Sequence, residues 1–263
     1  MERVALISDV HGNLTALEAV LADIEGRGIS RIWNLGDYVG KGPRGREVVD
    51  LCRERCEVNI LGNWDDFLPD PAREFGGDSL AWWLAQLGPG QGDWLRALPF
   101  SHDEWVSGRR LRVFHASEET VHRRVRYVRS QAEFEALFSN TPATGDGPLP
   151  DLIGYGDTHD PHYEVQLEAR TVFNTGAVGN SMGDPTAMYC ILEGEWGSQE
   201  TAPWSVAFAR VPYDVEAELA HARAVNMPDY EGYEVELRHG IYRGNLREWK
   251  AGERPTDYHE RPL

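Results

Sequence analysis

The chain has 263 residues, of which 41% are hydrophobic and 26% are charged, which predicts one folded domain with appendages and argues against disorder. Acidic residues outnumber basic residues by 43 to 26, and the formal charge of -17 argues against a stable nucleic-acid complex built on a broad positive surface. No apolar run approaches the roughly 18 residues of a membrane span, and the N-terminus turns polar too early for a signal peptide, so we expect a cytoplasmic protein with no membrane partner.

The first third of the chain alternates short β-rich runs with helical patterns. Residues 3–8 form an apolar run that is followed by a polar turn and by an apolar repeat of helical spacing over residues 14–24. The unit recurs with residues 31–35 as a strand, 46–56 as a helix and 57–61 as a further strand. Strands that alternate with amphipathic helices predict βαβ crossovers and a largely parallel sheet, whose ligands bind at the carboxyl ends of the strands.

The middle of the chain differs in character. Residues 71–99 carry tryptophans and leucines at helical spacing around a glycine-rich segment, which predicts two short helices in an inserted helical cap. A hairpin is expected over residues 104–114, and it ends on His115. Four arginines follow within residues 123–129. They either grip a polyphosphate or polynucleotide tail or pair with surface carboxylates.

From residue 151 the chain returns to strands separated by Gly, Asp and Asn clusters, which suggest a second, mainly antiparallel sheet. Residues 214–263 are expected to form a C-terminal helical extension, because apolar side chains recur at helical spacing over 214–226 and again near 230–242. No internal repeat or low-complexity linker divides the sequence. We therefore predict a single domain spanning residues 1–263.

Residues of the types that ligate metals follow four or five of the predicted strands. Each one alone is a weak signal, since a single Asp or His after a strand is commonly a helix N-cap or a surface residue. Together they offer carboxylate, amide and imidazole groups, a mixture that suits Mn and Fe better than a structural zinc. Two such ions can bind both the attacking and the leaving oxygen of a phosphoryl transfer. The set comprises Asp9, His11, Asp37, Asn63, His115, Asp157 and His159.

The order of these motifs, D-x-H, GD, GN, H and G-x-x-H, resembles that of the calcineurin-like metallophosphoesterases. The segment NTGAVGNSMGDP at residues 174–185 extends the match, which then covers residues 3 to about 192. The resemblance implies an α/β fold, a four-layer αββα sandwich of two facing mixed β-sheets. The tail, ARVPYDVEAELAHARAVNMP, is similar to that of a bacterial branch with phosphodiesterases and diadenosine-polyphosphate hydrolase-like proteins.

The resemblance also implies which residues ligate metal. One ion would be bound by Asp9, His11, Asp37 and His159, and the other by Asp37, Asn63, His115 and Asp157. Asp37 would bridge the ions together with a water or hydroxide that attacks phosphorus, so Asp37 and Asn63 are expected to be catalytic. The expected cofactors are two divalent ions, with Mn or Fe as the first choice and Mg, Zn or Ni as alternatives.

Two positions depart from the family pattern. Asp157 replaces a histidine of the usual Gly-His-x-His motif, which would favour a harder ion or leave a weak, water-bridged site. Trp64 replaces a histidine that in many relatives contacts phosphate or helps the leaving group, so Asp65 or His162 would have to supply any proton that is needed. The indole of Trp64 either stacks a nucleobase, worth about 1–3 kcal/mol per base, or packs beneath the cap.

Three further residues are candidates for substrate contact. Lys41 stands four residues after Asp37, where some relatives place a phosphate-contacting arginine, and a cation there can reach a nonbridging phosphate oxygen. The alternative for Lys41 is a solvated loop lysine. Asn13 is expected to cap the first helix while the amides of its loop face phosphate. His162 is the third candidate.

These features favour hydrolysis of a phosphodiester or phosphoanhydride bond in a small, nucleotide-type substrate. A phosphomonoesterase, including one that acts on phosphoprotein, is the alternative reaction. A catalytically weak scaffold with the same fold is the alternative of another class, and metal content separates it from an enzyme. The sequence leaves the substrate, the native metals and a homo-oligomeric state open.

Overall fold

The computed structural model describes residues 1–70 and 78–253, and within these residues the strands form two five-stranded sheets. The first sheet has the order β10-β9-β1-β2-β3. Parallel pairs join β1 to β2 and β2 to β3, while β9 runs antiparallel to both β1 and β10. Its strands are β1 (Glu2–Ile7), β2 (Arg31–Asn34), β3 (Val58–Asn59), β9 (Ala187–Gly194) and β10 (Ser205–Val211).

The second sheet has the order β4-β5-β6-β8-β7 and is also mixed. The hairpin β4-β5 and the edge pair β7-β8 are antiparallel, whereas β6 runs parallel to both of its neighbours. Its strands are β4 (Ser101–Val106), β5 (Arg109–Phe114), β6 (Leu152–Tyr155), β7 (His162–Val165) and β8 (Thr171–Asn174). The predicted hairpin over residues 104–114 is thus confirmed.

The expectation that the strands after residue 151 form their own, mainly antiparallel sheet is wrong. Strands β9 and β10 join β1 in the first sheet, and β6 and β8 extend the second sheet in parallel from β5. Strand β9 is buried along residues 187–192 because it lies at the interior of its sheet, between β1 and β10. The continuous apolar run of β9 predicts a buried strand, but it does not predict which of the two sheets the strand joins.

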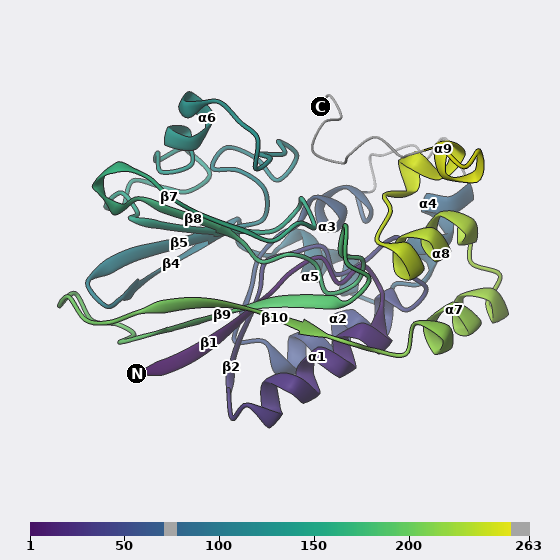
Figure 1. The fold of residues 1–263 in the computed structure, drawn as a ribbon. Coiled ribbons are helices and arrows are strands. Elements are labelled where there is room, and N and C mark those ends of the chain that lie inside the picture. Colours follow the sequence, from purple (N-terminus) through teal and green to yellow (C-terminus); the bar gives the residue numbers. More distant parts are fainter. Residues whose placement is uncertain (71–77, 254–263) are drawn as a thin grey trace.

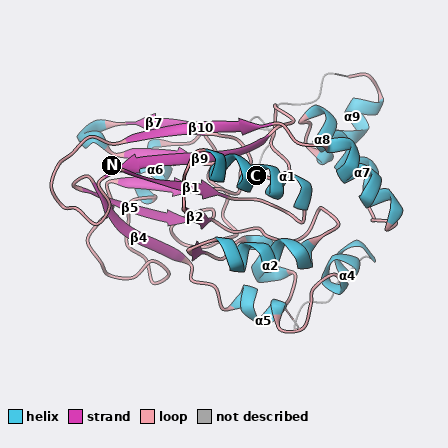
Figure 2. Cartoon of the chain, turned by 90° about the horizontal axis from the view of Figure 1, so that it is seen from below, coloured by secondary structure: helices cyan, strands magenta, loops and turns pink. Residues whose placement is uncertain are grey.

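The two sheets face each other and helices cover their outer faces, so the predicted αββα sandwich of mixed sheets is confirmed (Figure 1). Side chains alternate along β1: Val4 and Leu6 enter the core between the sheets, while Ala5 and Ile7 enter the core beneath the helices. The helices α1 (Leu14–Gly26) and α2 (Gly45–Arg55) lie against the first sheet (Figure 2), and the short helix α6 (Gln131–Ala136) packs Phe134 onto the second.

Short helices follow β3 and continue the chain toward β4. They are α3 (Asn63–Phe67), α4 (Asp78–Ala85) and α5 (Gln91–Arg96). Trp83 of α4 and Leu95 of α5 are buried in the core on the helix side of the first sheet. Residues 71–77 of the predicted cap lie outside the described residues.

The C-terminal segment adds helices beyond the end of the sandwich, on the side of α4 (Figure 1). They are α7 (Val215–Ala224), α8 (Tyr230–His239) and α9 (Leu246–Lys250), with a 3-10 turn at Arg243–Asn245 before α9. Another 3-10 turn, Leu167–Ala169, joins β7 to β8 in the second sheet. Buried Glu218 of α7 accepts hydrogen bonds from Thr15 and from Tyr233. Residues 254–263 of the predicted extension lie outside the described residues. No described helix is long and apolar enough to cross a membrane.

Candidate metal centre

The loops that follow strands of both sheets bring the predicted ligands together. The loop after β1 carries Asp9 and His11, and the loop after β2 carries Asp37. In the second sheet, His115 directly follows β5, and residues 157–159 follow β6. Because these strands run in parallel pairs within each sheet, their carboxyl ends meet at one edge of the sandwich.

Backbone strain is concentrated in these loops. Asp9, His11, Asp37, Asp157 and His159 all have φ between 48° and 62°, the left-handed region that is costly for residues other than glycine. Hydrogen bonds between loops hold this conformation, since the N–H groups of Asp9 and His11 donate to the carbonyls of Gly36 and Asp37, each at 2.9 Å. Strain that recurs in several loops at one place indicates that the side-chain positions themselves matter.

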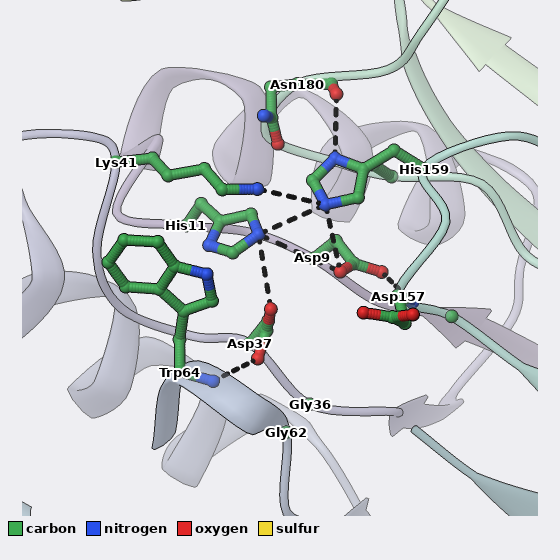
Figure 3. Close-up of polar contacts among 12 residues, drawn as sticks. Asp9, His11, Gly36, Asp37, Lys41, Gly62, Trp64, Asp157, His159 and Asn180 are labelled. Atoms are coloured by element: carbon green, nitrogen blue, oxygen red, sulfur yellow. Dashed lines mark hydrogen bonds and ion pairs between the residues drawn. The ribbon is translucent and has the colours of Figure 1, made fainter. Parts of the chain in front are cut away.

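A first cluster joins Asp9, His11 and His159, all of them at most 3% exposed (Figure 3). Oδ1 of Asp9 lies 3.3 Å from Nε2 of His159 and 3.8 Å from Nε2 of His11. The two Nε2 atoms are 3.3 Å apart. Buried Oδ1 accepts no hydrogen bond from the part of the chain that the structure describes, so a polar atom faces this cluster without a partner.

The histidines of the centre are oriented by backbone carbonyls. Each directs Nδ1 at a carbonyl oxygen, which can only accept, so Nδ1 carries a proton and Nε2 faces the centre. The pairs are His11 with Val39 at 3.1 Å, His159 with Asn180 at 2.9 Å, and His115 with Leu35 at 2.8 Å.

The charge state of the first cluster suits metal binding. Burial lowers the pKa of His11 and His159 well below the usual range, and the nearby Lys41 ammonium lowers both further. The lone pairs of these neutral imidazoles face each other and a carboxylate oxygen, an arrangement that a cation stabilises, and the Lys41 ammonium already lies 3.1 Å from Nε2 of His159. The nitrogen and oxygen atoms present therefore fit a divalent ion.

Asp37 connects this cluster to a second one, formed by Asp9, Asp37 and His115. Its Oδ2 lies 3.3 Å from Nε2 of His11, whereas its Oδ1 lies 3.4 Å from Nε2 of His115. The side-chain amide of Asn63 lies 3.1 Å from the same His115 nitrogen and within hydrogen-bond distance of both Asp37 oxygens. The two oxygens of one carboxylate thus face two groups of ligand atoms, as expected for a residue that bridges two ions.

The second cluster is rich in negative charge. Burial opposes protonation of His115, but Asp37, Asp9 and Asp157 outweigh burial and raise its pKa to about 10. A proton on Nε2 would hold the carboxylates together when no metal is bound. A divalent ion supplies more positive charge at the same place and displaces that proton, so metal binding here should release it.

Comparisons with known proteins decide the family. Residues 3–196 match the model of the calcineurin-like phosphoesterase superfamily domain. The chain belongs to this superfamily. It is a phosphoester-hydrolysing enzyme, and its Asp and His cluster is the expected place of divalent metal.

Several relatives share most of the length of this phosphoesterase. An uncharacterized protein of Methanocaldococcus jannaschii is 26% identical over 255 residues, which cover 87% of this chain and 95% of that protein. A metallophosphoesterase from Sphaerobacter thermophilus is 29% identical, with a TM-score of 0.69 over 91% of this chain and 99% of that one. A hypothetical protein from Pyrococcus horikoshii shares the fold, at 20% identity and a TM-score of 0.72 over 92% and 100% of the two chains.

Asp157 is predicted to ligate the second metal of the phosphoesterase, but the structure groups it with neither cluster. Its Oδ1 lies 4.0 Å from Nε2 of His115. Both carboxylate oxygens accept hydrogen bonds at 2.9 Å from Arg124, which stands 33 residues earlier in the chain. Burial opposes the charge on Asp157, yet Arg124 outweighs burial and lowers the pKa of the carboxyl below its usual range. Sequence reasoning missed this partner.

Two other arginines of residues 123–129 also meet carboxylates, which is one of the two interpretations that the sequence allowed. Arg123 contacts Glu118, and Arg129 contacts Glu164. Glu118 is buried at 2% exposure, so not all of these partners are surface groups as expected.

Trp64 and Asp65 lie in the first turn of α3, beside the carboxylate of Asp37. The backbone N–H of Trp64 donates to Oδ1 of Asp37 at 2.9 Å. The indole lies beside Lys41 and His11 (Figure 3) and also contacts Trp83 of α4, so it lines the centre and packs under that helix. Buried Asp65 accepts the N–H groups of Asp37, Tyr38 and Gly62 at 2.7 to 3.0 Å. These bonds engage both of its oxygens in positioning the Asp37 loop.

The remaining substrate candidates have different surroundings. Asn13 caps α1 by accepting the N–H of Ala16, and its amide nitrogen donates to the carbonyl of Gly179 at 2.8 Å, so its side chain is engaged within the fold. Nζ of Lys41 lies 3.1 Å from Nε2 of His159 and therefore points into the centre. His162 lies on β7, where Tyr155 contacts its ring nitrogen, and neither cluster includes it.

Proposed function

We propose that this phosphoesterase uses two divalent ions to hydrolyse a phosphodiester or phosphoanhydride bond of a small, nucleotide-type substrate. The observation that carries the proposal is the placement of Asp37, whose two oxygens face His11 on one side and His115 on the other. The proposed ligands are Asp9, His11, Asp37, Asn63, His115 and His159.

The donor set supports Mn or Fe as the ions. It combines carboxylate, amide and imidazole groups, and the three described cysteines, Cys52, Cys56 and Cys190, lie in the hydrophobic cores. Bound there, the ions would lower the pKa of a water molecule toward neutrality and stabilise the charge that develops on the phosphoryl oxygens. The chain itself fixes the ligand atoms, excludes bulk water from the buried clusters and supplies the cation of Lys41.

The residue at position 64 supports a substrate whose leaving group needs little protonation, such as the phosphate that is released from an anhydride. An indole carries no proton that it can transfer at neutral pH, so Trp64 cannot protonate a leaving group. The carboxylate of the next residue, Asp65, is held by three backbone N–H groups. Burial and the neighbouring Asp37 raise the pKa of Asp65 to about 8, but both of its oxygens accept N–H groups, which supports leaving groups that need little protonation.

Trp64 and Lys41 also support a nucleotide-type substrate. Nζ of Lys41 lies 5.9 Å from the centroid of the indole and 3.1 Å from His159, so an aromatic ring and a cation flank the first cluster. A cation can contact a phosphate oxygen while an aromatic surface contacts a base. Gly40 allows this arrangement, since a Cβ at its position would lie 2.0 Å from the indole.

A substrate comparison in the presence of Mn²⁺ tests the reaction. Values of kcat/KM are measured for bis-p-nitrophenyl phosphate, p-nitrophenyl phosphate and a diadenosine polyphosphate. We expect the diester or the dinucleotide to be preferred over the monoester. Preference for p-nitrophenyl phosphate would overturn the proposal in favour of a phosphomonoesterase.

Substitution of Trp64 tests the nucleotide part. We expect Trp64→Ala to raise KM for the dinucleotide by about tenfold, in line with stacking of about 1–3 kcal/mol per base, and to change KM for bis-p-nitrophenyl phosphate much less. Trp64→Phe is the matched control because it keeps an aromatic ring. Equal changes in KM for both substrates would leave Trp64 a packing residue only.

A further inference from the structure

The ion pair of Asp157 and Arg124 lies at the metal centre and has no role in the function proposed above. Nε of Arg124 donates to Oδ2 of Asp157 and Nη2 donates to Oδ1, each at 2.9 Å. This is the bidentate geometry in which a guanidinium binds a carboxylate most specifically. The carboxylate is buried at 3% exposure, while the arginine side chain is 29% exposed. The pair therefore runs from the buried centre toward solvent.

Asp157 is held rigidly beside the first cluster. Its backbone N–H donates to Oδ2 of Asp9 at 3.0 Å, on the oxygen opposite the one that faces His11 and His159. Figure 3 shows the carboxylate next to Asp9. Because Asp157 is fixed relative to a proposed metal ligand, the guanidinium that it binds is fixed relative to the centre as well.

Charge distinguishes two roles for this pair. A carboxylate that is neutralised by a guanidinium is a poorer ligand for a cation, and arginine does not lose its proton in proteins. A guanidinium next to an ion repels it but attracts the phosphate oxygens of a substrate, which it can bind through two N–H groups. The pair is therefore better suited to hold phosphate than to hold metal.

We propose that Arg124 binds a phosphate oxygen of the substrate and that Asp157 positions the guanidinium instead of ligating the second metal. The inference rests on the phosphoester chemistry of the proposed function and adds to it a phosphate-binding residue. Arg123 offers a matched control, since it is an adjacent arginine that pairs with Glu118 instead of Asp157.

Binding of inorganic phosphate to the Mn-loaded protein tests the role of Arg124. We expect Arg124→Ala to raise the Kd for phosphate by about tenfold or more, which corresponds to loss of a charge-assisted hydrogen bond, and Arg124→Lys to raise it less. Arg123→Ala should stay within about twofold of the wild type. An unchanged Kd in Arg124→Ala, with the fold intact by circular dichroism, would overturn the proposal.

The metal content of Asp157→Asn tests the other half. We expect this variant to bind as many Mn ions per chain as the wild type, while its Kd for phosphate rises because the guanidinium loses its anchor. Loss of one Mn ion would show that Asp157 is a ligand and would overturn its positioning role. Both measurements work without turnover, so a protein that binds phosphate through Arg124 but hydrolyses no nucleotide would overturn only the proposed function.

Discussion

At the scale of single residues, the centre is built as much from backbone atoms as from side chains. Carbonyl groups orient the rings of His11, His115 and His159, and three N–H groups converge on Asp65. The sequence motifs name the ligands but contain no sign of these contacts, since any residue supplies a carbonyl or an N–H group. The backbone of the loops, which the motifs do not specify, therefore determines how the ligand side chains are oriented.

Asp65 offers a test of this view. We expect Asp65→Asn to destabilise the protein by about 1–3 kcal/mol, because a buried acceptor of three N–H groups is weakened, and to lower kcat through displacement of Asp37. The loss in kcat should be the same for good and poor leaving groups, as measured with a series of aryl phosphate diesters. A loss that grows as the leaving group becomes poorer would instead identify Asp65 as a proton donor.

The neighbouring carboxylate provides the control for that experiment. Asp66 belongs to the same helix but is 45% exposed and contacts His122. Asp66→Asn should leave both the stability and the rate near those of the wild type.

At the scale of elements, helix α8 of the C-terminal segment supports the loop around Asn180, which orients the proposed metal ligand His159. Buried Glu236 accepts a hydrogen bond from Nδ2 of Asn180 at 3.2 Å, and the carbonyl of Asn180 accepts the proton of His159. Arg243 donates to both oxygens of Glu236 at 2.7 and 2.9 Å. A chain of contacts thus leads from the C-terminal segment to the first metal cluster.

The Glu236 carboxylate makes the stability of the folded protein depend on pH in the acid range. Burial opposes its charge, but Arg243 outweighs burial and holds the pKa below the usual 4.5. A lowered pKa in the folded state stabilises the protein above about pH 4.5, and that contribution is lost as the pH falls through the lower folded value. We expect Glu236→Gln to cost about 3 kcal/mol at pH 7 and to flatten the decline of stability in acid, both measured by denaturant unfolding.

A surface carboxylate of the same helix is the comparison for Glu236. Glu234 is 31% exposed and pairs with Arg238, so Glu234→Gln should change stability by less than about 1 kcal/mol. An acid decline as steep in Glu236→Gln as in the wild type would place the responsible group elsewhere.

The sequence predicts features that depend on local patterns, but it does not predict contacts between residues that are far apart in the chain. Strand ends followed by Asp, His or Asn are local patterns, and the structure places the predicted ligands at one edge of the sandwich. Three other features depend on residues that meet only after folding. They are the sheet that β9 joins, the pairing of Arg124 with Asp157 and the hydrogen bond between Asn180 and Glu236. No periodicity or spacing encodes such pairs, so the sequence does not predict these features.

At the scale of the whole molecule, the centre depends on both halves of the sandwich. The loops after β1 and β2 come from one sheet, and those after β5 and β6 come from the other. The formal charge of -17 does not oppose phosphate binding at such a place, because two divalent ions would concentrate about four positive charges where the loops meet. The negative formal charge is one reason to propose small phosphate compounds as partners in place of long nucleic acids.

The proposed bridging of two divalent ions by Asp37 predicts how many ions the protein binds. Native mass spectrometry of protein prepared without chelator and loaded with Mn²⁺ counts the ions bound to each chain. We predict two ions in the wild type and at most one in Asp37→Asn, with Asp66→Asn retaining two. Fewer than one ion per wild-type chain, or an unchanged count in Asp37→Asn, would contradict this account.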